Sequence, residues 1–220
     1  MKTTTILING SPFTYQDEVG DPFVYGSMSV GEMDSLLKFS TKLLDDCGIS
    51  FFLAFGTLLG AVRESNFIKG DSDVDIIVTD EKKLYISLPY LWEHGLCIDR
   101  IFEEELYSFH SEARHPVDFY IMRTPDHWMY KKWCVSIRGF FAPKRFFQTI
   151  VPDGCQLGDQ RYPCPQNPER LLEWWYGKTW RIPQSKKATE DVLLRRIEKF
   201  PSKLLGKMRK KLKKMGRDKS

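Results

Sequence analysis

The chain has 220 residues, of which 42% are hydrophobic and 14% aromatic, and its formal net charge is +4. This composition fits a globular protein with a sizeable core, and nothing in it argues for disorder before the C-terminal tail. No apolar run reaches the roughly 18 residues that a membrane-spanning helix needs. The N-terminal MKTTTILING is too short in apolar residues for a signal peptide and lacks a small-residue cleavage site. We therefore expect a cytoplasmic protein.

The charge is divided unevenly along the chain. Residues 186–220 carry 14 Lys or Arg and 4 Asp or Glu, whereas residues 1–185 carry 19 and 25. We therefore expect two units, a globular domain over 1–185 and a basic tail over 186–220. Apolar residues recur in the tail at helical spacing among lysines, which predicts a basic amphipathic helix: Leu204, Met208, Leu212 and Met215.

The tail has three interpretations. The one we prefer is that residues 201–220 hold the protein peripherally on the anionic inner face of a membrane. A solvated helix without a partner is the simplest alternative. Nucleic acid is not expected as a partner, because residues 201–220 contain no aromatic side chain to stack on a base.

The first elements are read from capping residues and helical spacing. Residues 1–28 lack clear periodicity and are predicted as an irregular arm with one short strand at Thr5–Ile8. Ser29 and Glu32 match a capping box. Apolar residues then recur at helical spacing, which predicts a helix over 30–47 that ends at Gly48.

A short strand, turn, helix and second strand follow. Ser50–Phe55 is a Phe-rich apolar run that predicts a buried strand, and the pair Gly56-Thr57 interrupts it. A short helix is expected over Leu58–Arg63 and a second strand over Asp73–Thr79. Because residues two apart on a strand share a face, Asp73 and Asp75 should project side by side.

The remaining elements complete an α/β pattern. We expect a helix around Lys82–Trp92, strands at Cys97–Glu103 and Val117–Met122, and a helix at Glu169–Tyr176. Residues 151–168 are rich in proline and are predicted as a loop. The fold class is therefore α/β, with a mixed sheet flanked by helices.

The paired aspartates suggest a metal site. Two adjacent carboxylates repel each other and need a cation between or above them, and Mg²⁺ is the usual choice because it prefers hard oxygen ligands, with Mn²⁺ as the alternative. Asp118, on the apolar run VDFYI, has a matching outward-facing parity. If its strand neighbours the first pair, then Asp73, Asp75 and Asp118 converge and complete a metal site.

The glycine turn suggests an anion site beside these acids. Gly56 allows close approach of the backbone to a ligand, and a helix N-terminus offers N–H groups that favour negative charge. Thr57 adds a hydroxyl group, and Arg63 is suited to bidentate pairing with phosphate. We therefore assign binding of donor phosphate to Gly56, Thr57 and Arg63, and catalysis to the three aspartates. Asp71 is read as an outer-shell residue or simply as a loop acid that caps the turn.

The histidines and cysteines carry weaker signals. His115 has two interpretations, a contact to phosphate or acceptor and a partly buried structural role, while His94 and His110 have no evident partners. The cysteines are five in number and form no C-x-x-C pair, so free thiols are expected. A zinc site made of His127 and Cys134, Cys155 and Cys164 is the alternative.

Three segments together resemble the LicD family. GTLLGAVR at 56–63 with DSDVDI at 71–76 is similar to the signature of that family, which includes bacterial phosphocholine transferases and eukaryotic fukutin-related proteins. HPVDFYIM at 115–122 resembles the strand that brings the third acid, and LLEWWYGKTWRIP at 171–183 resembles a C-terminal element of the family. The resemblance implies a nucleotidyltransferase-like fold.

The resemblance also implies an activity. Family members transfer a phospho-alcohol from a CDP-linked donor to a sugar hydroxyl. The expected partners are therefore a CDP-linked donor such as CDP-choline and a cell-surface glycan, including a lipid-linked one. Carried onto this chain, Asp73 and Asp75 bind Mg²⁺, and Asp118 binds a second metal or accepts the proton of the attacking hydroxyl. Two alternatives stay open, a small-molecule nucleotidyltransferase that uses an NTP and a catalytically silent protein docked on a membrane.

Overall fold

A computed structural model describes residues 2–17, 26–102, 105–111, 115–125, 131, 134–137 and 140–184. The predicted helix of the tail lies outside these residues, so the tail and the domain boundary at residue 185 stay predictions. Within the described residues, no helix is long and apolar enough to cross a membrane.

The centre of the fold is one mixed sheet, which contains seven strands in the described part of the chain. Five strands follow one another across it in the order β3 (Phe51–Leu53), β4 (Val74–Val78), β7 (Pro116–Arg123), β6 (Leu106–His110) and β5 (Cys97–Phe102). Two more extend it, β8 (Cys134–Ile137) beside β7 and β9 (Phe140–Pro143) beside β8. The pair β4–β7 is parallel, and the other pairs are antiparallel. The mixed α/β sheet expected from the sequence is confirmed.

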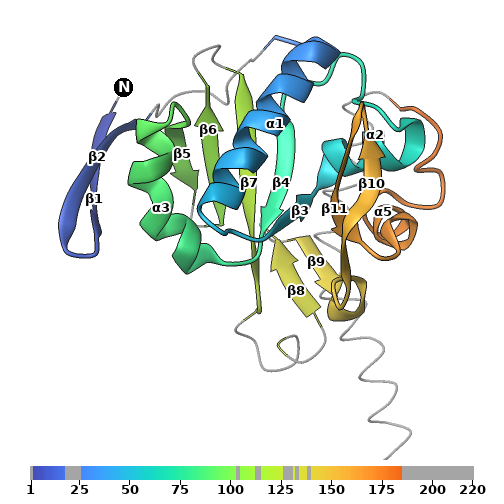
Figure 1. Cartoon of the computed structure of the whole chain (residues 1–220). Helices are drawn as coiled ribbons and strands as arrows, with labels where there is room; N and C mark the ends of the chain where they lie inside the picture. Colours follow the sequence, from blue (N-terminus) through green and yellow to red (C-terminus); the bar gives the residue numbers. More distant parts are fainter. Residues whose placement is uncertain are drawn as a thin grey trace, which may run out of the picture.

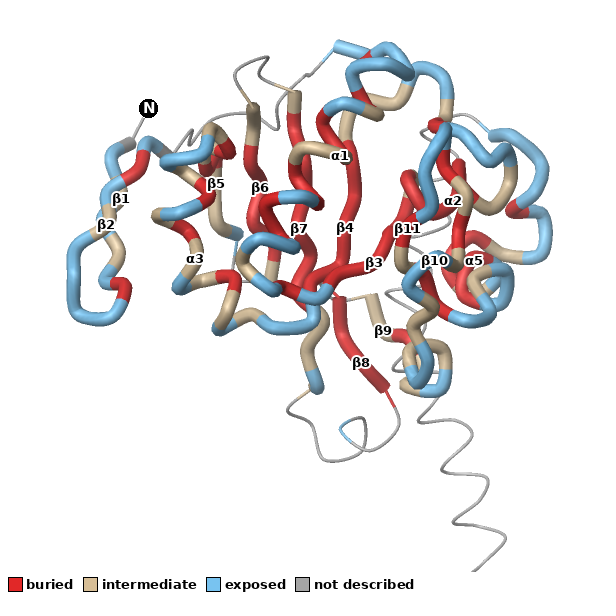
Figure 2. The backbone as a smooth tube through the Cα atoms, in the orientation of Figure 1, coloured by how far each residue is buried: buried red, intermediate tan, exposed pale blue. Residues whose placement is uncertain are grey.

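Helices pack on the sheet and beside its β3 edge (Figure 1). α1 (Val30–Asp46) contacts β4 and β7, and α3 (Glu81–Glu93) contacts β5. α2 (Phe55–Glu64) contacts β4 and α5 (Pro168–Tyr176), and the short helix η1 (Lys144–Phe146) also contacts α5. All residues of β3 and β4 are buried, and Figure 2 shows the burial concentrated in the central strands. Asp75 on β4 is therefore held by a strand that is covered on both faces.

Local signals placed α1 correctly. Ser29 is its N-cap: the Ser29 hydroxyl accepts from the Glu32 amide at 3.2 Å, and the Ser29 amide donates to Oε2 of Glu32 at 2.7 Å. Gly48 follows the helix with φ +62°, a left-handed conformation in which glycine lacks the steric penalty of a Cβ. Both ends of the helix are thus fixed by residues that the sequence identifies.

The prediction of an irregular N-terminal arm is wrong for residues 2–17. β1 (Lys2–Ile8) and β2 (Ser11–Asp17) form an antiparallel hairpin that packs beside β5. The turn is Asn9-Gly10, with φ +50° and +82°. Two positive φ values in a two-residue connection are the geometry of a type I′ hairpin turn, for which Asn-Gly is the preferred pair. The Asn-Gly pair is thus a local signal for this hairpin, which the expectation of an irregular arm did not include.

The prediction of a loop over 151–168 is also wrong. β10 (Ile150–Leu157) and β11 (Gln160–Pro165) pair as a second antiparallel hairpin, and α5 begins at Pro168. Prolines are tolerated there because each strand of a two-stranded ribbon has a free edge on which a missing N–H group breaks no ladder bond. A register shift between Val151 and Cys155 also interrupts the ladder near Pro152.

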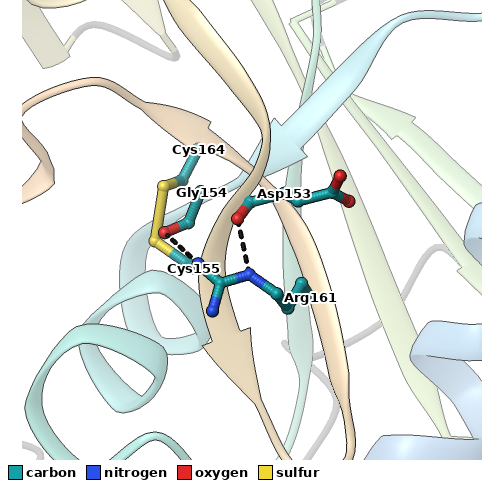
Figure 3. The surroundings of a disulfide bond; sticks show 5 residues. All are labelled: Asp153, Gly154, Cys155, Arg161 and Cys164. Atoms are coloured by element: carbon teal, nitrogen blue, oxygen red, sulfur yellow. Dashed lines mark hydrogen bonds between the residues drawn. A yellow bond between two sulfur atoms is a disulfide. The ribbon is translucent and has the colours of Figure 1, made fainter.

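A disulfide joins the two strands of this hairpin, Cys155 to Cys164 (Figure 3). Both residues are buried, and Arg161 donates from Nε to the carbonyl of Asp153 at 2.7 Å beside them. The expectation of free thiols is therefore wrong for this pair, while Cys47, Cys97 and Cys134 form no disulfide. Of the four zinc ligands considered, Cys155 and Cys164 are consumed by the disulfide, and His127 lies outside the described residues. In the described part of the chain, Cys134 therefore has no other candidate ligand beside it for a zinc ion.

The disulfide predicts a measurable gain in stability. Replacing both Cys155 and Cys164 by serine should lower the free energy of unfolding by about 2–3 kcal/mol, because the bridge restricts the unfolded chain. Urea unfolding of the wild type, the double variant and a Cys47→Ser control measures the difference.

Thiol counting checks the same point without a variant. In denaturant without reductant, iodoacetamide should label three cysteines, and after reduction all five. Five labelled thiols before reduction would contradict the bridge. Since disulfides persist mainly in oxidising compartments, the same count on protein taken from its native cell also tests the expectation of a cytoplasmic location.

Candidate active site

Three carboxylates meet on one face of the sheet. One ligand oxygen each from Asp73, Asp75 and Asp118 lies within 4.8 Å of the others. Asp75 and Asp118 are buried and Asp73 is half-buried. The convergence expected from strand parity is present, and its cause is the parallel register of β4 and β7, which places Asp75 directly beside Asp118.

Hydrogen bonds hold the two buried carboxylates in place. The amide of Gly56 donates to Oδ2 of Asp75 at 2.9 Å. On the other side, the Ser108 hydroxyl donates to Oδ1 of Asp118 at 2.6 Å, and the Tyr120 hydroxyl donates to its Oδ2 at 3.4 Å. Each of these two carboxylates is therefore oriented by its neighbours.

The electrostatics of the cluster favour a cation. Burial raises the pKa of Asp75 well above its usual value, and the charges of Asp73, Asp118 and Asp71 raise it further, against the lowering effect of the Gly56 amide. A buried carboxylate surrounded by others is stabilised by a proton or by a metal ion. The donor set is all oxygen, which suits Mg²⁺ or Mn²⁺.

The turn between β3 and α2 brings the backbone to these acids. The sequence placed Gly56 and Thr57 before the helix, but α2 begins at Phe55, so both lie in its first turn. A Cβ added to Gly56 would lie 2.8 Å from Oδ2 of Asp71 and 3.3 Å from Oδ2 of Asp75. Gly56 was expected to let the backbone approach a ligand. In the structure, the groups that come close to it are the carboxylates of Asp71 and Asp75.

Phe55 sustains this turn in an unfavourable backbone conformation. Its φ is +33°, which is an outlier for a bulky residue. Its ring stacks on Trp175 at a centroid distance of 4.7 Å and contacts Tyr120 at 4.7 Å and Phe140 at 5.3 Å. This aromatic packing supplies the energy that holds a strained residue next to Gly56.

Thr57 and Arg63, the other two residues assigned to donor phosphate, each make a contact within the protein. The Thr57 hydroxyl is buried and accepts from the Asp75 amide at 2.9 Å, so this side chain fixes β4 to α2. Arg63 lies two helical turns along α2, about 10 Å from Gly56 at the usual rise per residue, and its Nη2 pairs with Oε1 of Glu64 at 2.5 Å. Their roles in donor binding stay predictions.

Two further residues, Asp71 and Tyr176, interact electrostatically with the cluster. Asp71 lies close enough to influence both Gly56 and Asp75, which supports the outer-shell interpretation. Tyr176, predicted as the end of a helix, is the buried last residue of α5, and burial together with the charges of Asp75, Asp71 and Asp73 raises its pKa well above its usual value. In the sequence, Tyr176 is singled out only by the resemblance of segment 171–183 to a LicD element.

The histidines have partners that the sequence did not reveal. Nε2 of His115 lies 3.1 Å from Oε1 of Glu32, a contact that favours its structural interpretation. Hydrogen bonds from Ser29 and His115 lower the pKa of Glu32 to about 2. Nδ1 of His94 lies 2.8 Å from the Tyr90 carbonyl, and His110 pairs with Asp99.

A mixed α/β sheet that carries a buried acidic triad beside a glycine-containing helix start is typical of enzymes that transfer phosphoryl or nucleotidyl groups. Residues 48–167 match the family described as LicD/FKTN/FKRP, nucleotidyltransferase domain. The chain therefore belongs to the LicD/FKTN/FKRP family, as a transferase domain of the nucleotidyltransferase type.

Similar proteins include ribitol-5-phosphate transferase FKTN from Homo sapiens, 28% identical over 156 residues, and from Mus musculus, 30% identical over 155 residues. Each alignment covers 67% of this chain and 33% of the relative. The chain thus spans about a third of the length of these relatives.

Two solved structures also align with the chain. The antibiotic-resistance factor ANT(2'')-Ia is 11% identical with a TM-score of 0.49, over 86% of this chain and 98% of that one. The lincosamide antibiotic adenylyltransferase LnuA is 11% identical with a TM-score of 0.47, over 78% and 98%.

Proposed function

We propose that the chain is a Mg²⁺-dependent transferase that moves a phospho-alcohol from a CDP-linked donor to a hydroxyl group of a glycan. The observation that carries the proposal is the triad of Asp73, Asp75 and Asp118 in a domain of the LicD/FKTN/FKRP family. Since the FKTN relatives are named as ribitol-5-phosphate transferases, CDP-ribitol is the first donor to test, ahead of CDP-choline.

The three aspartates would hold the metal ion, which supplies positive charge for the diphosphate of the donor when it is bound. The chain's own residues do the rest by positioning. Gly56 leaves room for the carboxylates, and its amide fixes Asp75. Thr57 ties α2 to β4, so that the acids and the helix start keep one geometry. Such catalysis depends mainly on placement and charge complementarity.

A donor screen tests the function. The full chain is incubated with CDP-ribitol, CDP-choline, CDP-glycerol or CDP-ethanolamine, with and without Mg²⁺, and CMP release is followed by chromatography. We expect Mg²⁺-dependent CMP release from one of the four. Pyrophosphate release from an NTP, with no CMP from any CDP-linked donor, would instead favour a small-molecule nucleotidyltransferase. The family description as a nucleotidyltransferase domain is the reason to include this assay.

Calorimetry separates these enzymes from a silent binding protein. If neither Mg²⁺ nor any of the nucleotides binds, the transferase proposal fails and the membrane-docked protein is favoured. A matched pair of vesicle-binding assays, with the full chain and with a chain that lacks residues 201–220, tests the proposed peripheral attachment. Salt-sensitive binding to anionic vesicles should depend on those residues.

A further inference from the structure

A second polar group lies on the sheet, at the pair β5–β6. His110 is the last residue of β6, and its Nδ1 is hydrogen-bonded directly to Oδ1 of Asp99 on β5. Asp99 is 2% exposed, whereas the His110 side chain is 22% exposed. A β-bulge between Ile98 and Arg100 places Asp99 out of the regular ladder and beside the imidazole. The result is an accessible histidine anchored on a buried carboxylate.

The strand register puts His110 on the same face as the acidic triad. Ser108 pairs with Asp118 across β6 and β7, and their side chains are hydrogen-bonded at 2.6 Å. His110 lies two residues beyond Ser108 and therefore shares its face, about 7 Å along the strand from the Ser108–Asp118 pair.

His110 also lies at the end of the strands where the triad is found. It pairs with Pro116, at the start of β7, and Asp118 follows two residues later. Asp73 immediately precedes β4 and Asp75 is its second residue, and β4 runs parallel to β7. The buried acids and the half-buried imidazole thus occupy one end and one face of the sheet.

The hydrogen bond to Asp99 selects one tautomer of the neutral imidazole. Because a carboxylate accepts the proton on Nδ1, the lone pair of the neutral ring is on Nε2. The other charged or titratable side chains of the neighbouring strands on this face are Cys97 and Arg100 of β5 and Asp118 of β7. Nε of Arg100 is buried and has no hydrogen-bond partner in the described part of the chain. None of these groups replaces Asp99 as the partner of Nδ1.

We propose that His110 binds the attacking hydroxyl group of the acceptor and takes up its proton, and that Asp99 is the residue that positions it. This inference rests on the proposed function. As the acceptor oxygen forms its bond to phosphorus, its proton passes to Nε2 of His110. The bond between that phosphorus and the bridging oxygen breaks, and CMP leaves with the electron pair. Asp118 then remains with the metal-binding group, and the proton has a separate acceptor.

Variants of the dyad test this role. With glycerol as a simple hydroxyl acceptor and whichever of the four CDP-linked donors the wild type cleaves fastest, CMP release is measured for the full chain. His110→Gln should reduce the rate about 100-fold or more, because an amide can still donate to Asp99 but cannot take up a proton. Asp99→Asn should reduce it about 10-fold, because it releases the ring from one orientation. His94→Gln is the matched control, since that imidazole contacts a backbone carbonyl at the end of α3.

Two further readouts exclude a merely structural effect. Donor affinity measured by calorimetry should be unchanged in His110→Gln, and added imidazole should restore part of the rate of His110→Gly but not of His94→Gly. A wild-type rate in His110→Gln, or no rescue of His110→Gly, would overturn the assignment. If the wild type itself releases no CMP from any donor, the proposed function fails first, and this role of His110 fails with it.

Discussion

Asp75→Asn is expected to abolish Mg²⁺-dependent CMP release, with a loss of at least about 10³-fold. Asp75 is a buried member of the triad, and the Gly56 amide orients its carboxylate. The amide oxygen of asparagine offers a metal ion far less charge than a carboxylate does. The fold should survive, because the amide oxygen can still accept from the Gly56 amide. Steady-state assays, together with Mg²⁺ calorimetry, measure the loss. Asp153→Asn, at an exposed carboxylate of β10, is the control and should retain full activity.

The same variant should unfold at a higher temperature than the wild type when a chelator keeps the protein free of metal. The native pKa of Asp75 is raised by burial and by Asp73, Asp118 and Asp71, so its ionised form destabilises the folded state. The native state then binds the proton more tightly than the unfolded state. Wild-type stability is therefore lost as pH rises from the ordinary range of an aspartate through the raised native pKa.

The advantage of Asp75→Asn in melting temperature should accordingly grow with pH across that interval and then level off. Added Mg²⁺ should reverse the order by stabilising the wild type alone. Calorimetric melting curves at several pH values, with chelator or with Mg²⁺, measure both effects. A variant that is less stable than the wild type at neutral pH without metal would contradict the electrostatic description of the site.

Gly56→Ala is expected to reduce Mg²⁺ affinity and to lower CMP release about 100-fold, with little change in stability. The new Cβ would lie 2.8 Å from Asp71 and 3.3 Å from Asp75, so the carboxylates must move. Side-chain ends shift at small cost, but a displacement of about 1 Å in an active site costs about two orders of magnitude in rate. The helix itself gains from alanine, which offsets part of the strain.

Gly31→Ala provides the matched control for this substitution. Gly31 also lies in the first turn of a helix, α1, and a Cβ there has no atom within 4 Å. It should leave turnover unchanged and raise the melting temperature slightly. Equal Mg²⁺ affinity and turnover in Gly56→Ala and Gly31→Ala would show that the carboxylates do not need the space that Gly56 provides.

The sequence by itself determined the features that depend on neighbouring residues. The capping box of Ser29 and Glu32, the positive φ of Gly48 and the alternation along β4 and β7 are all local, because each follows from contacts within one helix or strand. The same alternation selected Asp73, Asp75 and Asp118 as side chains able to share a face. The Asn9-Gly10 turn is a further local signal, and it specifies the N-terminal hairpin that the expectation of an irregular arm missed.

Tertiary structure decided everything that depends on which distant segments meet. The parallel pairing of β4 with β7 places Asp75 beside Asp118. The position of β6 between β7 and β5 brings Ser108 and His110 to the face of the sheet that carries these carboxylates. The packing of Phe55 among Tyr120, Phe140 and Trp175 and the bridge from Cys155 to Cys164 arise in the same way. Strand order, side-chain packing and disulfide pairing are set by the free energy of the whole core, to which no single stretch of sequence is a sufficient guide.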